Sequence, residues 1–192
     1  MTEVSSLTGR LLVATPVLAD PNFDRAVVLL LDHDEQGSLG IVLNRPTPVG
    51  VQDILGSWAE LAGDPGVVFQ GGPVSLDSAL GVAVVPGESD ALSSGGPLGW
   101  RRVHGAIGLV DLEAPPELLA AELGSLRIFA GYAGWGPGQL EDELAEGAWY
   151  VVDSEPGDVS SPDPERLWRA VLRRQRSELA MVATYPDDPS LN

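Results

Sequence analysis

The sequence predicts an α+β fold, because predicted strands and short predicted helices are interspersed along it without the regular spacing of strand–helix–strand units. Short runs rich in Val and Leu indicate strands, and apolar residues at three- and four-residue spacing indicate amphipathic helices. Regular alternation of the two would predict a doubly wound parallel sheet. Its absence favours a sheet with helices packed around it.

Seven short apolar runs bounded by turn-forming residues are predicted strands. They are Arg10–Thr15, Ala26–Asp32, Leu39–Leu43, Val67–Gln70, Ala79–Val85, Arg127–Tyr132 and Ala148–Val152. The second and third runs flank the turn-rich segment 33–38 (HDEQGS), which predicts a hairpin. Because the runs are continuously apolar, we expect strands buried on both faces or strands of a closed sheet.

Four segments are predicted helices because they combine an apolar stripe with proline near the start or glycine after the end. They are Val51–Ala62, Pro116–Leu123, Gln139–Glu146 and a segment from Asp163 to about Arg174. Two segments rich in turn-forming residues, 86–99 and 153–163, are predicted surface loops, the first of them mobile. Neither resembles a linker, so residues 1–192 are predicted to form a single domain.

The composition of the 192 residues excludes several classes of protein. The chain has no cysteine, which excludes disulfide frameworks, thiolate metal sites and cysteine nucleophiles. Its longest apolar run, Ala26–Leu31, is far shorter than the ~20 residues that span a bilayer. No signal-peptide pattern is visible at the N-terminus. We therefore expect a cytoplasmic protein with no membrane contact.

The charge of the chain argues against direct contact with nucleic acid. The formal net charge is −17, and all 11 basic residues are arginine. Because nucleic-acid binding gains much of its affinity from cations that neutralise phosphates, direct binding to DNA or RNA is not expected. Five arginines gather on the last predicted helix, where they form either a solvated face or a local contact for an anion or a partner: Arg166, Arg169, Arg173, Arg174 and Arg176.

Common catalytic motifs are absent from the sequence, including the nucleophile elbow, the phosphate-binding P-loop and the zinc-protease helix. Of the two histidines, His33 lies in the predicted hairpin loop between two aspartates, where a solvated turn is expected. His104 follows the long loop. We predict no catalytic residue, no metal site and no cofactor.

Glycine-rich and polar turns follow several of the predicted strands. Segment 131–139 (GYAGWGPGQ) is predicted to be a tight turn between a strand and a helix, either with Trp135 packed beneath it or as an anion-binding turn. Segment 70–74 (QGGPV) is a second tight turn. Arg45 follows Asn44 at a strand end, where it either bridges loop carbonyls or is the cation of a polar pocket.

These segments, taken in order, resemble the YqgE/AlgH family of bacterial proteins. The resemblance rests on LLVATPVLADPNFDRAVVLLLDH, GSLGIVLNRP, FQGGPV, FAGYAGWGPGQLEDELAEGAWYVV, LWRAVL and the terminal DPSLN, and it extends from about Leu7 to Asn192. The residues that match the family's motifs are Asp20, Pro21, Phe23, Asn44, Arg45, Pro46, Gly71, Gly72, Pro73, Gly134, Trp135, Gly136, Gly138 and Gln139.

The resemblance implies an α+β fold in which a strongly bent, split and mostly antiparallel sheet forms a pseudo-barrel flanked by helices. The family has no established biochemical activity, and one member is named as a transcriptional regulator of alginate synthesis. No helix-turn-helix with a basic recognition helix is apparent here, so a regulatory role would be indirect.

We hypothesise that the polar turns converge on one cleft, where Arg45 and backbone amides hold a ligand and Trp135 offers a stacking face. The candidate binding residues are Asn44, Arg45, Gln70, Gly71, Gly72, Tyr132, Gly134, Trp135, Gly138 and Gln139. The expected function is a non-enzymatic binding or regulatory module, whose partner is a small anionic ligand or another protein. The alternative is a hydrolase that uses His104, His33 or a carboxylate such as Asp20 as its base.

Overall fold

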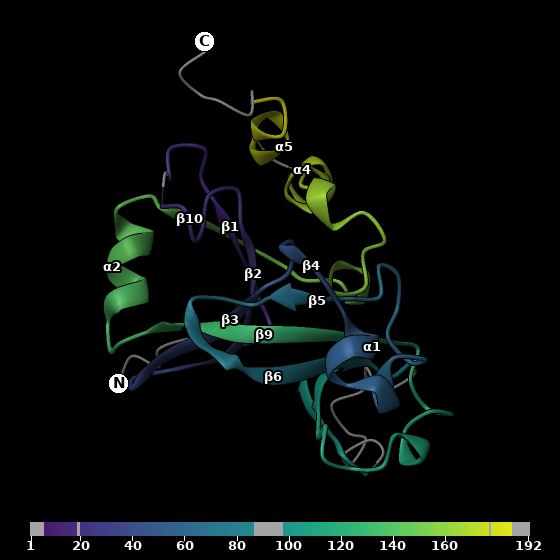
Figure 1. Ribbon diagram of the computed structural model, residues 1–192. Helices are drawn as coiled ribbons and strands as arrows, with labels where there is room; N and C mark the ends of the chain where they lie inside the picture. The colour runs from purple at the N-terminus through teal and green to yellow at the C-terminus, as the bar shows by residue number, and fades with distance from the viewer. Residues whose placement is uncertain (1–5, 19, 87–97, 177, 186–192) are drawn as a thin grey trace.

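The computed structural model describes residues 6–18, 20–86, 98–176 and 178–185, and its strands form one strongly bent sheet (Figure 1). Most of the predicted loop 86–99 lies outside the described residues. The ten strands within the described ranges are β1 Leu11–Ala14, β2 Val27–Asp34, β3 Gly37–Val42, β4 Pro46–Gly50, β5 Val67–Gln70, β6 Val74–Val84, β7 Trp100–His104, β8 Ile107–Val110, β9 Ser125–Trp135 and β10 Trp149–Val152.

The long strand β9 is where the sheet divides. The main path runs β10–β1–β2–β3–β9–β6–β8–β7, with antiparallel pairing throughout. The end of β9 pairs with β3, while Phe129 and Ala130 pair in parallel with β5, which in turn pairs with β4. The expected α+β fold, with its strongly bent, split and mostly antiparallel sheet, is confirmed.

Two predicted helices lie close to their expected bounds, Gln139–Glu146 and the segment from Asp163 to about Arg174, the second as a 3-10 turn followed by a helix; the other two are shorter than predicted. The helices are α1 Val51–Ile54, α2 Gln139–Ala145, α3 Pro156–Val159, α4 Leu167–Arg173 and α5 Leu179–Val182, with 3-10 turns at Gly56–Trp58, Pro116–Leu118 and Pro164–Arg166. The helix predicted over Val51–Ala62 is interrupted at Leu55, whose backbone is not helical (φ −130°, ψ 63°). Of the helix predicted over Pro116–Leu123, only Pro116–Leu118 forms, as a 3-10 turn that ends at Leu119 (φ −112°, ψ −19°).

Three strands were not predicted from the sequence. Strand β4 contains two prolines, which a sheet tolerates at an edge but not in its middle. Strands β7 and β8 lie at the far edge of the sheet, beyond β6. Strand β9 also continues to Trp135, so Gly131 and Gly134 belong to a strand. The turn predicted over residues 131–139 is therefore limited to residues after Trp135.

Strand β2 shows why its sequence is continuously apolar. Val27, Leu29 and Leu31 contribute to one core cluster, which includes residues of α4, and Val28 and Leu30 contribute to another, which includes Leu140 of α2. The strand is therefore buried on both faces, as expected. A third cluster, around Trp58 and Trp100, lies under β6, β8 and β9. Among the described residues, no helix is both long and apolar enough to span a bilayer.

Candidate functional site

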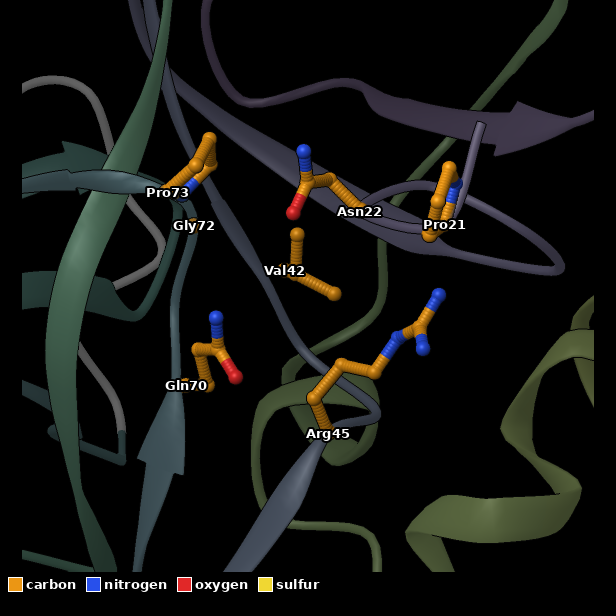
Figure 2. A pocket seen from close by; sticks show the side chains of 7 residues that line it. All are labelled: Pro21, Asn22, Val42, Arg45, Gln70, Gly72 and Pro73. Carbon is orange, nitrogen blue, oxygen red and sulfur yellow. The ribbon is translucent and has the colours of Figure 1, made fainter. Parts of the chain in front are cut away.

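A small hollow of about 110 Å³ opens where three polar segments meet (Figure 2). Its lining residues are Pro21, Asn22, Val42, Arg45, Gln70, Gly72 and Pro73, and we call it the Arg45 hollow. The segments are the turn after β1, the end of β3 and the turn between β5 and β6. In Figure 2, the side chains of Asn22, Gln70 and Arg45 surround Val42.

Backbone hydrogen bonds hold these segments together. The amide of Val42 donates to the carbonyl of Gly71 (2.8 Å), and the amide of Gln70 donates to the carbonyl of Arg45 (2.8 Å). Glycine is required in the β5–β6 turn, because a Cβ atom on Gly72 would overlap with the backbone carbonyl group of Tyr132. The predicted convergence of Arg45 with the Gln70–Gly72 turn is thus visible in the structure.

Arg45 is the cation of this hollow. Its Nη2 atom donates a hydrogen bond to the carbonyl oxygen of Asp24 (2.6 Å), and its side chain is half-buried. Within the described part of the chain, no carboxylate pairs with it, and its other donors make no hydrogen bond. Guanidinium donors are arranged in a planar fork that matches a carboxylate or phosphate. The fork of Arg45 is therefore available to an anion.

Asn22 and Gln70 add carboxamide groups to the wall of the hollow. Both side chains are exposed, and neither carboxamide makes a hydrogen bond to another described residue. The backbone amide of Asn22 donates to Oδ1 of Asp20 (2.8 Å), so Asp20 shapes the turn that presents Asn22. The binding residues predicted from the sequence did not include Pro21 or Asn22. Val42 and Pro73 were also missed, and they carry no polar signal.

Asn44 has a structural role next to the Arg45 hollow. Its Oδ1 atom accepts a hydrogen bond from the amide of Val27 (3.0 Å), and its Nδ2 atom donates to the carbonyl of Arg25 (2.9 Å). Both ends of the carboxamide are therefore used to hold the end of β3 against the turn before β2. These two hydrogen bonds explain why asparagine occurs at this strand end, and the explanation needs no bound ligand.

A second hollow, of about 230 Å³, adjoins the first and shares Arg45 with it. Its lining residues are Asp24, Arg25, Asn44, Arg45, Glu165, Trp168 and Arg169, and we call it the Trp168 hollow. It lies between the turn before β2, the β3–β4 corner and the start of α4. Arg45 thus stands between two recesses that open at one corner of the sheet.

The remaining candidate residues are not among those that line the Arg45 hollow. Trp135 is only 6% exposed and packs against Phe23 and Trp149, so the expected stacking face on Trp135 is wrong. Neither hollow includes Gly134, Gly138 or Gln139 in its lining, nor the side chain of Tyr132, which packs against the core.

Glu143 explains the unusual sequence around Trp135. Its Oε1 atom accepts hydrogen bonds from the indole nitrogens of Trp135 (3.0 Å) and Trp149 (2.9 Å), and its Oε2 atom accepts one from Nε2 of Gln139 (3.0 Å). The amide of Gly136 in turn donates to Oε1 of Gln139 (3.0 Å). This network holds α2 against β9 and β10.

The candidate bases of the alternative hydrolase do not gather into a catalytic centre. His33 was expected in a solvated turn, but it lies in β2, is 4% exposed, and its Nδ1 atom is hydrogen-bonded to Oγ of the cross-strand neighbour Ser38 (2.7 Å). His104 is exposed at the end of β7 and packs over Gly9. Asp20 shapes the turn described above. None of the three lines either hollow.

The arginines of the last predicted helix mostly make contacts within the chain. Arg174 forms two hydrogen bonds to the buried carboxylate of Asp158 (2.6 and 2.7 Å), and this pairing raises the pKa of Arg174. Arg166 pairs with Asp163 (3.4 Å). Nη1 of Arg169 donates to the carbonyl of Tyr185 (2.7 Å) and to that of Ala183. Arg173 stays exposed.

One further arginine is buried without lining a hollow. Nη2 of Arg127 donates to the carbonyls of Asp64 (2.9 Å) and Ser161 (2.7 Å), and its guanidinium lies 4.4 Å from the ring centroid of Phe69. Burial lowers the pKa of Arg127 to about 10. Its contacts tie two loops to the sheet.

Comparison with known proteins shows the same fold and family. A family model described as AlgH-like matches residues 11–180. A UPF0301 protein of Streptomyces avermitilis is 87% identical over 100% of this chain and 98% of its own length. A UPF0301 protein of Thermobifida fusca is 48% identical over 97% of this chain and 96% of its own.

Two solved structures are similar over nearly the whole chain. A crystal structure of a Corynebacterium diphtheriae protein has a TM-score of 0.87 and 31% identity, covering 96% of this chain and 95% of that one. The solution structure of the AlgH protein from Pseudomonas aeruginosa has a TM-score of 0.65 and 29% identity, covering 97% of both chains. The chain therefore belongs to the AlgH-like, UPF0301 family, as its sequence motifs predict.

Proposed function

We propose that this protein is a non-enzymatic binding module that holds a small anionic ligand in the Arg45 hollow. The observation that carries the proposal is the guanidinium of Arg45, which has a single hydrogen bond to a backbone carbonyl and no carboxylate partner among the described residues. In a chain with a net charge of −17, carboxylates are abundant, so a cation left without one is available to an external anion.

The polar groups around Arg45 suit a carboxylate or phosphate group. Arg45 offers a planar fork of donors, and the carboxamides of Asn22 and Gln70 add donors from two other segments. The hollow has room for roughly four water molecules, taking ~30 Å³ for each. That volume accommodates one anionic group.

The strong negative charge also bears on how the protein could have the regulatory role that the family resemblance implies. A net charge of −17 repels the phosphate backbone of DNA, so a role in transcription would pass through the bound ligand or a protein partner. The anion site would then be where a signal enters the molecule.

The proposal is tested by thermal unfolding in increasing concentrations of orthophosphate or acetate. Chloride solutions of the same ionic strength are the reference. A ligand at 100 times its dissociation constant stabilises the folded state by about 2.7 kcal/mol. For a domain of this size, this raises the melting temperature by roughly 5–10 °C. We expect Arg45→Gln to abolish the increase.

The control variant is Arg173→Gln, which removes the same charge from an exposed position on α4. It should retain the full stabilisation by the anion. If Arg45→Gln and Arg173→Gln respond alike, or if neither anion stabilises the wild-type protein, the proposed function is wrong.

A further inference from the structure

Arg45 is the only charged residue among the described residues that line the Arg45 hollow. The adjoining Trp168 hollow adds no net charge, because the rest of its lining consists of two arginines, two carboxylates and two uncharged residues. A single guanidinium matches the charge of a monoanion such as a carboxylate. The second charge of a phosphate dianion would meet no cation in the hollow, and the net charge of −17 would repel it.

The donors that remain on Arg45 also fit a carboxylate. A guanidinium has two edges that each present a pair of parallel N–H groups, and Nη2 contributes one hydrogen to each edge. Because Nη2 donates one hydrogen to the carbonyl oxygen of Asp24 (2.6 Å), one complete edge is left. The two oxygens of a carboxylate occupy such an edge in full. A phosphate on the same edge would leave its other oxygens to the carboxamides of Asn22 and Gln70.

The uncharged walls of the hollow favour hydrocarbon next to the anionic group. Pro21, Val42 and Pro73 line it, and Figure 2 shows the two proline rings on either side of Val42. Both prolines are exposed residues, so their rings offer apolar surface to a ligand. Burial of one methylene group is worth ~0.8 kcal/mol, which is about a fourfold gain in affinity. Orthophosphate has no hydrocarbon with which to use this surface.

We infer that the ligand of this protein is a monocarboxylate whose carboxyl group ends a short aliphatic chain, as in a small organic acid or an acidic side chain of another protein. The carboxylate lies along the free edge of the Arg45 guanidinium, where Asn22 and Gln70 also donate to it. The carbon atoms next to the carboxylate pack on Pro21 and Pro73. The inference rests on the proposed function and narrows its ligand from anions in general to carboxylates on hydrocarbon.

The test compares acetate, propionate, orthophosphate and ethylphosphonate by isothermal titration calorimetry on the full chain at constant ionic strength. Propionate and ethylphosphonate carry the same ethyl group, and ethylphosphonate is a dianion above its second ionisation. We expect propionate to bind about two- to fourfold more tightly than acetate, because one more carbon packs on the walls. It should bind at least about threefold more tightly than orthophosphate or the phosphonate dianion, whose second charge lacks an ion pair. Below its second ionisation, ethylphosphonate should approach the affinity of propionate.

A variant that adds a charge tests whether the single cation sets this preference. Asn22→Arg brings a second guanidinium to the wall of the hollow, and we expect the phosphonate dianion then to bind more tightly than propionate. The side chain of Asn22 is exposed and makes no hydrogen bond to another described residue, so the variant should fold. The control, Gln52→Arg, makes the same change of charge on an exposed residue of α1 and should preserve the wild-type order.

A capped glutamate, N-acetylglutamate N-methylamide, distinguishes the two sources of the carboxylate. Its side chain carries the same two-carbon chain and carboxylate as propionate, but it is attached to peptide groups. Binding as tight as that of propionate, or tighter, assigns the carboxylate to a protein partner. Weaker binding assigns it to a free organic acid.

The outcomes separate this inference from the proposed function. If binding depends on Arg45 but orthophosphate or the phosphonate dianion binds as tightly as propionate, the inference is overturned and the proposed function stands. If acetate binds as tightly as propionate, or if Asn22→Arg and Gln52→Arg have the same effect on the order, the inference is again overturned. If no anion binds the wild-type protein, both fail.

Discussion

Removal of the Glu143 carboxylate should destabilise the fold, although no ligand contact is lost. Glu143→Ala leaves the indole nitrogens of Trp135 and Trp149 without their acceptor, and both rings are buried. A buried donor left unsatisfied costs roughly 1–3 kcal/mol. Because Glu143 is half-buried and water partly replaces it, we take the lower part of this range for each indole and expect a loss of about 2–3 kcal/mol.

A loss of that size lowers the melting temperature of a domain of this length by roughly 5–10 °C. Urea unfolding followed by tryptophan fluorescence measures the free energy of unfolding directly. The matched control is Glu141→Ala, which removes an exposed carboxylate from the same helix and should cost less than about 0.5 kcal/mol. Equal losses in the two variants would refute the structural role assigned to this network.

Three further predictions concern stability. Gly72→Ala should lower the free energy of unfolding by more than about 2 kcal/mol, because the new methyl group would overlap with neighbouring backbone. Gly66→Ala, which places its methyl group in open space, should leave the free energy measured by urea unfolding nearly unchanged. Asp158→Ala should cost about 3–5 kcal/mol in the same assay, since it strips the partly buried Arg174 of a bidentate partner. Burial raises the pKa of Tyr150, so its neutral form stabilises the fold below the ordinary tyrosine pKa and this contribution is lost as pH rises through the raised value. In an absorbance titration, Tyr150→Phe should remove a phenol that ionises above the ordinary tyrosine pKa.

The strands that cross the core were predictable from sequence because burial on both faces leaves a continuous apolar run. The bounds predicted for β5, Val67–Gln70, match the structure, and β2 and β9 were found although their ends extend further. Strand β4, which is paired on one side to another described strand, carries no such signal because two of its five residues are prolines. The edge strand β10, by contrast, was predicted, because its residues are apolar.

Three of the seven residues that line the Arg45 hollow could be predicted for a similar reason. Arg45, Gln70 and Gly72 end or follow buried strands, and paired strands bring such ends together. Trp135 misled the interpretation because a glycine-rich segment was expected to be a turn, whereas β9 passes through it. The indole of Trp135 donates to Glu143, eight residues further on, and residue spacing alone does not predict a hydrogen bond between an indole and a helix carboxylate.

The central claim, that Arg45 binds an anion together with Asn22 and Gln70, is tested most directly by a nuclear magnetic resonance titration of the side-chain N–H signals. As orthophosphate is added at constant ionic strength, we predict saturable shifts of the Arg45 Nε–H and of the Asn22 and Gln70 carboxamide signals with one common dissociation constant. The Nε–H of exposed Arg173 should shift only in proportion to concentration. Unsaturable shifts at all four side chains would contradict the claim.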